Sequence, residues 1–89
     1  MRAVISVVGK DQVGILAKVS TKCAEYNANI VDVTQTILQD LFTMVMLADI
    51  TALNCEFGVL SEALSALGQE LGLQINVMHE DIFNHMHRI

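Results

Sequence analysis

The sequence predicts an α+β domain in which one four-stranded antiparallel sheet carries two helices on one face. Three observations lead to this fold class. Four segments concentrate or alternate apolar residues as strands do, and two longer segments space them as amphipathic helices do. These segments follow one another in the order βαββαβ, which is a strand, helix and strand unit repeated once.

The first strand and the first helix meet at a loop that contains glycine. Residues 2–8 are rich in Val and Ile and end at Gly9, and helical spacing runs from residue 12 to about residue 26. Asp11 is the expected N-cap, which places Gly14 at the third helical position, where glycine costs about 1 kcal/mol relative to alanine. We therefore expect the missing side chain to admit a close packing partner, or a small ligand at the free N–H groups of the helix start. The buried face of this helix should comprise Ile15, Leu16, Val19, Cys23 and Tyr26.

The next two strands should form a hairpin. Residues 30–38 and 41–50 have the composition of strands, and only Gln39 and Asp40 separate them, so the two strands should pair antiparallel. Upstream of this hairpin, Asn27 and Asn29 suit the exit from the first helix, because asparagine tolerates the left-handed backbone conformation.

The second half of the chain repeats the pattern of the first. The pattern of residues 54–71 predicts a helix, because apolar residues recur every three or four positions. Gly72 should end this helix. Residues 73–79 alternate again and predict the last strand. Right-handed crossovers fold such a chain into a ferredoxin-like sheet, with its first and third strands in the centre.

The third strand should carry apolar side chains on both faces of the sheet. Phe42, Met44 and Met46 point one way, whereas Val45 and Leu47 point the other way. Both helices lie on one face, so the second apolar face remains uncovered and would promote aggregation. We expect a partner subunit or the C-terminal tail to cover it.

Length and composition limit the classes of function. The 89 residues suffice for one domain over residues 1–89, with 81–89 as a C-terminal tail. A net charge of −5 without a basic cluster argues against nucleic acid, and one aromatic residue in a predicted strand, Phe42, cannot form a platform for base stacking. No apolar run approaches the length of a membrane span, so neither a membrane partner nor a signal peptide is expected. Cys23 and Cys55 form no Cys-x-x-Cys pair and fit a reducing cytoplasm.

Three stretches of the chain resemble one known family. They are Gly-Lys-Asp-Gln-Val-Gly-Ile-Leu at residues 9–16, Val-Ser at 19–20 and Asn-Ile-Val-Asp-Val-Thr-Gln at 29–35. Together with the order of elements, they resemble a stand-alone ACT domain of bacterial or archaeal type. The nearest forms are those of glycine-cleavage regulators and formyltetrahydrofolate deformylases. The resemblance covers the whole chain.

The resemblance implies a non-enzymatic regulatory module that forms a homodimer or a higher homo-oligomer. Such a module binds an amino acid or a similar small metabolite between two domains and passes the change to a regulated protein partner. By position, the ligand-binding residues are Asp11, Gln12, Val13, Gly14 and Ile15 of one copy, with Asn29 and Ile30 of the other. Amino-acid-binding members often have Asn where Asp11 stands. The alternative is a ligand-free module for oligomerisation or protein interaction.

The physical chemistry of the loop agrees with such a ligand. The N–H groups at a helix start and their partial positive charge suit a carboxylate, and Asp11 can accept hydrogen bonds from an α-ammonium group.

The C-terminal segment offers a second candidate site. It contains imidazole and carboxylate side chains of the kind that bind zinc or another divalent ion, namely His79, Glu80, Asp81, His85 and His87. Their spacing matches no established metal motif, and the nearby apolar residues have partial helical spacing. We therefore favour a tail that docks on the open sheet face or on a partner, and we expect neither a metal nor another cofactor.

No set of residues in the chain predicts catalysis. Cys55 lies near the start of the second predicted helix, where the helix dipole lowers the pKa of a thiol, but Glu56 opposes that effect. Cys23 falls on the core-facing stripe of the first helix. The sequence contains no Ser-His-Asp pattern, no phosphate-binding loop and no paired carboxylates in a recognisable setting, so binding is favoured over chemistry.

Overall fold

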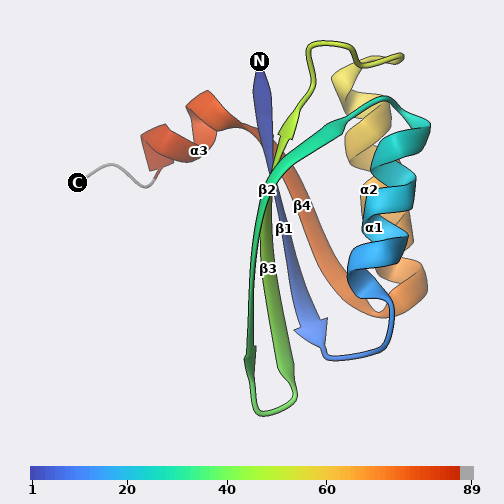
Figure 1. Cartoon of the computed structure of the whole chain (residues 1–89), viewed down its shortest axis with the longest axis vertical. Coiled ribbons are helices and arrows are strands. Elements are labelled where there is room, and N and C mark those ends of the chain that lie inside the picture. Colours follow the sequence, from blue (N-terminus) through green and yellow to red (C-terminus); the bar gives the residue numbers. More distant parts are fainter. Residues whose placement is uncertain (87–89) are drawn as a thin grey trace.

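A computed structural model describes residues 1–86 and shows the predicted order of elements followed by one further helix (Figure 1). The elements are β1 (Arg2–Lys10), α1 (Ile15–Glu25), β2 (Asn29–Leu38), β3 (Leu41–Asp49), α2 (Phe57–Leu71), β4 (Leu73–His79) and α3 (Glu80–Met86). The strands lie within two residues of their predicted bounds, and both predicted helices begin three residues later than expected.

The four strands form one antiparallel sheet in the order β2-β3-β1-β4, so β1 and β3 are central as predicted. Val7 on β1 lies opposite Met44 on β3 and Ile75 on β4, which sets the register of the inner face. Figure 1 shows α1 and α2 together on one face of the sheet, with α3 on the opposite side. The prediction of a ferredoxin-like α+β fold is confirmed.

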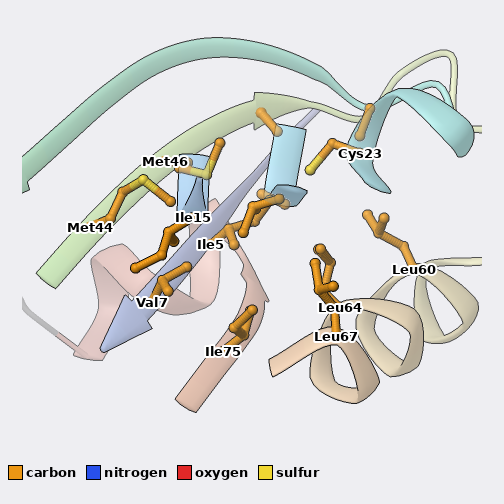
Figure 2. Packing of buried hydrophobic residues seen from close by; sticks show 14 of the residues in the cluster. Ile5, Val7, Ile15, Cys23, Met44, Met46, Leu60, Leu64, Leu67 and Ile75 are labelled. Atoms are coloured by element: carbon orange, nitrogen blue, oxygen red, sulfur yellow. The ribbon is translucent and has the colours of Figure 1, made fainter. Parts of the chain in front are cut away.

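The core lies between the sheet and the two long helices (Figure 2). Its buried side chains come from alternate positions of the strands and from one stripe of each helix, and include Ile5, Val7, Ile15, Cys23, Met44, Met46, Leu60, Leu64, Leu67 and Ile75. Each such aliphatic side chain stabilises the fold by about 1.5–3 kcal/mol. Phe42 is 4% exposed within this core, so it presents no aromatic surface for stacking.

Helix α1 begins at Ile15, so the expectation that Asp11 is its N-cap is wrong. Gly14 occupies the N-cap with φ 84°, and no side chain caps the helix. The N–H group of Asp11 instead donates to the carbonyl oxygen of Asp40 at 2.8 Å, which holds Asp11 at the end of the sheet. The expectation that Leu16 is buried is also wrong, because 38% of Leu16 remains exposed at the first turn of α1.

Helix α2 begins at Phe57 rather than at residue 54 because Asn54 is hydrogen-bonded to the end of α1. Its backbone N–H donates to the carbonyl oxygen of Tyr26 at 3.1 Å, and its side-chain amide donates to that of Glu25 at 3.0 Å. The end of α1 and the loop before α2 are thereby joined. The left-handed conformation predicted at the helix ends is confirmed at Asn27 (φ 61°) and Gly72 (φ 72°). It is wrong for Asn29, which begins β2 and has no positive φ.

The sheet face opposite α1 and α2 is apolar in part, as predicted. Val8 and Val45 are each 38% exposed on it, and Leu47 is half-buried. Val4, at the other end of β1, is only 6% exposed and lines a groove together with Phe83 of α3. The C-terminal helix therefore covers one end of the open face and leaves the rest uncovered.

Candidate functional site

The loop between β1 and α1 is held at two points. The backbone N–H of Asp11 donates to Asp40 in the β2–β3 turn at 2.8 Å. The side-chain amide of Gln12 donates to the carbonyl oxygen of Leu71, at the end of α2, at 2.8 Å. These two hydrogen bonds join three elements that are distant in sequence, so the loop is a positioned structure rather than a free connection.

Gly14 is required by backbone conformation and not by close packing. Its φ of 84° lies in the left-handed region, which L side chains rarely adopt. A Cβ built at Gly14 would meet only the side chain of Lys18, at 3.9 Å. The expectation of a close packing partner within the chain is therefore wrong, and the space outside Gly14 is open. The first N–H groups of α1 face this space without a side-chain cap, so they can receive an anionic group.

The predicted site residues of the loop differ in which of their groups a ligand could reach. Val13 is 95% exposed and projects from the loop, whereas Ile15 is 2% exposed and packs in the core. Only the backbone of Ile15 can contact a ligand. Asp11 is exposed, and the amide nitrogen of Gln12 is engaged with Leu71, which makes Gln12 a positioning residue.

The second predicted half of the site lies at the start of β2. Asn29 is opposite Asp49, Ile30 is opposite Ala48, and a bulge follows Ile30 in the pairing with β3. Asn29 is exposed at the rim of a hollow of about 370 Å3, which is lined by Ala24, Asn27, Ala28, Asn29 and Ala52. The small side chains leave room there for an apolar group from outside.

The two halves do not meet within one chain. Lys10, next to the loop, lies opposite Leu41 on β3, whereas Asn29 lies opposite Asp49 at the far end of the same strand. Eight residues of strand correspond to about 26 Å. A ligand that contacts both halves must therefore lie between two copies of the chain.

Two of the C-terminal candidates, His79 and Glu80, serve packing and ion pairing. The ring of His79 stacks on Phe57 with centroids 4.1 Å apart, and Glu80 pairs with Arg2 at 2.7 Å. Across residues 1–86, no three His, Cys, Asp or Glu side chains converge as a metal site would require. His85 is exposed, and His87 lies outside the described residues. The aromatic stack was not predicted, because Phe57 and His79 come from separate elements that only the fold brings together.

The two cysteines have different environments. Cys23 is fully buried, and burial raises the pKa of its thiol from 9.0 to about 11, so it remains protonated near neutral pH. Cys55 is half-buried, packs against the core and directly precedes Glu56, the N-cap residue of α2. Neither forms a disulfide in the described part of the chain.

No helix within residues 1–86 is long and apolar enough to cross a membrane.

The ferredoxin-like sheet and the glycine loop before α1 define a small α+β domain with two helices on one face of an antiparallel sheet. A family profile for the ACT domain matches residues 2–78, and the chain belongs to that family. It is 55% identical to a UPF0237 protein of Methanococcus maripaludis over 86 residues, which are 97% of this chain and 96% of the relative.

Solved structures agree with this assignment. An ACT domain protein from Streptococcus pneumoniae is 42% identical, with a TM-score of 0.81 over 93% of each chain. A candidate glycine cleavage system transcriptional repressor is 26% identical, with a TM-score of 0.71, over 86% of this chain and 44% of that one. A formyltetrahydrofolate deformylase from Pseudomonas syringae shares the fold at 23% identity, with a TM-score of 0.78, over 88% of this chain and 27% of that one. The expected resemblance to these forms of the ACT domain is confirmed.

Proposed function

We propose that this chain is a non-enzymatic regulatory module that binds an amino acid or a similar small metabolite between two copies of itself. The observation that carries the proposal is the loop of residues 11–14. This loop is tied to the β2–β3 turn and to the end of α2, and it presents a left-handed glycine and an uncapped helix start to the outside.

Edge-to-edge pairing of β2 would complete the site. β2 is an edge strand of the sheet, and most of its residues are exposed. Antiparallel pairing of β2 with β2 of a second copy would place Asn29 of one chain beside Leu38 of the other. Leu38 leads directly into the turn that holds Asp11, so Asn29 would approach the partner's loop.

The chemistry of the two halves fits an α-amino acid. The uncapped N–H groups of α1 suit its carboxylate, and the carboxylate of Asp11 can accept hydrogen bonds from its ammonium group. The amide of Asn29 can supply either a donor or an acceptor. Val13 and the three alanines that line the hollow beside Asn29 offer apolar contacts, so they suit a small apolar side chain.

A regulatory role follows from this arrangement, because a ligand that bridges two copies stabilises one assembly over another. One structural relative, the candidate glycine cleavage system repressor, is itself described as a regulator. We place the module in the cytoplasm, where two free thiols are stable, and we expect it to act on a separate protein partner.

Isothermal titration calorimetry with each of the twenty amino acids tests the proposal. We expect at least one to bind, and binding should weaken at least tenfold in Asn29→Ala and in Gly14→Ala. Gly58→Ala is the matched control, because a Cβ at Gly58 meets nothing within 4 Å and its φ is not positive. Absence of binding to the wild-type chain would refute the proposal.

A ligand-free oligomerisation module is the second candidate, and a specific observation favours it. Large apolar side chains are exposed around the hairpin end of the molecule, namely Val13 (95%), Ile37 (55%), Leu38 (69%) and Leu41 (45%). Stable oligomers in analytical ultracentrifugation, together with no calorimetric response to any amino acid, would select this candidate over the first.

A further inference from the structure

Helix α3 projects from the end of β4 and turns one side chain back toward the sheet. Figure 1 shows this helix on the side of the sheet opposite α1 and α2. The ion pair between Arg2 and Glu80 joins its first turn to β1. Among residues 81–86, Phe83 alone is half-buried and the others are exposed. Phe83 is therefore the residue through which the rest of α3 faces the sheet.

A groove of about 440 Å3 lies between α3 and the open face of the sheet. Two neighbouring rows of paired strand residues form its floor. One row holds Val45, Ser6 and Asn76, which are partners across β3, β1 and β4, and the next row holds Val4 and Met78. Pockets that bind small molecules measure about 300–1,000 Å3 and combine apolar walls with a few polar groups. The size and the lining of this groove are of that kind.

Ser6 and Asn76 give the groove one polar spot. They are opposite each other on β1 and β4, and the Cβ atoms of such partners lie about 4.5–5.5 Å apart. Neither side chain forms a hydrogen bond within residues 1–86. Ser6 is half-buried, yet no buried side-chain oxygen of the described residues lacks a partner, so its hydroxyl remains open to the groove. A hydroxyl beside a carboxamide can both donate and accept, so the pair suits a ligand group that does the same.

The groove favours an uncharged ligand. None of the side chains that line it is charged. Arg2 and Glu80, where α3 begins, pair with each other at 2.7 Å and leave no free charge there. An ion that enters an apolar site without a partner loses its hydration without compensation. A neutral amide or hydroxyl group is therefore preferred over a carboxylate or an ammonium group.

We propose that the groove beneath α3 binds a neutral aromatic molecule that carries an amide or hydroxyl group. The aromatic ring lies between Phe83 and the apolar floor, where Met78 adds a favourable contact between sulfur and the ring. The polar group of the ligand meets Ser6 and Asn76. An α-amino acid is a zwitterion and does not fit this description. The site therefore goes beyond the proposed function and lies apart from the loop between β1 and α1.

A ligand in the groove holds α3 against the sheet. A helix of seven residues is marginal in water by itself, and α3 follows β4 without a linker. A molecule that contacts both Phe83 and the sheet makes contacts that only the docked helix allows. Binding therefore favours the docked position of α3 and gives the module a response that is independent of the loop.

Titration of benzamide into the isotope-labelled full chain, followed by two-dimensional NMR, tests the proposal. Benzamide combines one aromatic ring with one carboxamide. We expect saturable shifts of the amide signals of Ser6, Asn76 and Phe83, together with slower hydrogen exchange at the backbone amides of α3. Benzoate has a similar shape and a negative charge, and toluene has the ring without a polar group. Each should bind at least fivefold more weakly than benzamide.

Matched variants separate the polar spot from the rest of the face. Ser6→Ala and Asn76→Ala each remove a hydrogen-bonding group and should weaken benzamide binding at least threefold. Gln74→Ala is the control, because Gln74 lies two residues before Asn76 on the same face of β4, is exposed and does not line the groove. This control should leave the binding of benzamide unchanged.

Three results would overturn the proposal: no shifts at the groove, equal binding of benzoate, or unchanged affinity in both Ser6→Ala and Asn76→Ala. Groove signals that move on dilution of the protein alone would show that a second copy fills the groove, and they would also overturn it. None of these results depends on whether an amino acid binds at the loop.

Discussion

Two glycines of α2 allow helix–sheet packing to be tested with one type of substitution. Gly68 is buried against β4, and a Cβ built there would lie 2.7 Å from the carbonyl oxygen of Leu73 and 3.0 Å from Cγ1 of Ile75. Gly58 lies in the first turn of the same helix, where a Cβ meets nothing within 4 Å. Gly68→Ala should therefore destabilise the fold, and Gly58→Ala should not.

The expected magnitudes follow from two opposing terms. Alanine stabilises a helix interior by up to about 1 kcal/mol relative to glycine, which applies in full at Gly68 and in part at Gly58, in the first turn. At Gly68 this gain is opposed by overpacking of about 1–3 kcal/mol. The contact is with a backbone oxygen of the strand, which cannot rotate away as a side chain can, so the penalty should lie in the upper part of that range. We expect Gly68→Ala to lose about 1–2 kcal/mol of unfolding free energy and Gly58→Ala to gain up to about 1 kcal/mol.

Urea and thermal unfolding followed by circular dichroism would measure this difference. For a domain of this size, 1 kcal/mol corresponds to about 4–8 °C in Tm, so a difference of about 1–3 kcal/mol between the two variants should separate their Tm values by about 4–24 °C. A Gly68→Ala protein as stable as Gly58→Ala would show that α2 does not approach β4 as closely as the structure indicates, and would refute the reasoning.

The remaining predictions concern two ionisable groups. Because the pKa of Cys23 is about 11 in the folded chain and 9.0 ordinarily, the unfolded chain loses its thiol proton first, and unfolding free energy should fall as the pH rises from 9 to 11. Urea unfolding across this range should show a shallower fall for Cys23→Ala, and an equal fall would contradict the assignment. Hydrogen bonds from the hydroxyl and the backbone N–H of Thr51 lower the pKa of Asp49, and stability from this carboxylate is lost as the pH falls through that lowered value. Thr51→Ala should raise the pKa of Asp49 in an NMR titration, and an unchanged value would count against the hydroxyl as the main cause.

Most of the fold could be predicted because the relevant signals are local. Alternation on β3 places Phe42, Met44 and Met46 toward one face whatever the rest of the chain does, and all three are buried there. The predicted bounds of β4 are the observed ones, because Gly72 stops α2 by a left-handed turn that lies within the same few residues. Patterns of this kind depend only on neighbours in sequence.

The start of α1 could not be predicted in the same way. Asp11 has the chemistry of an N-cap, but its N–H group is drawn to Asp40 in a turn that lies far along the chain. Gln12 likewise engages Leu71 at the end of α2. Both partners approach the loop only after the sheet has formed, so the position of Asp11 relative to the start of α1 is decided by the fold.

The sequence by itself determined the order of the elements, the central strands and the family resemblance, because apolar periodicity and short motifs are properties of adjacent residues. Only the tertiary structure decided the role of Gly14, whose positive φ arises from a loop tied to two distant elements. It also decided that Asn29 lies at the opposite end of the sheet from this loop, because β3 runs the length of the sheet between them. The physical reason is that distances between elements depend on strand register and packing, which no single segment of the chain contains.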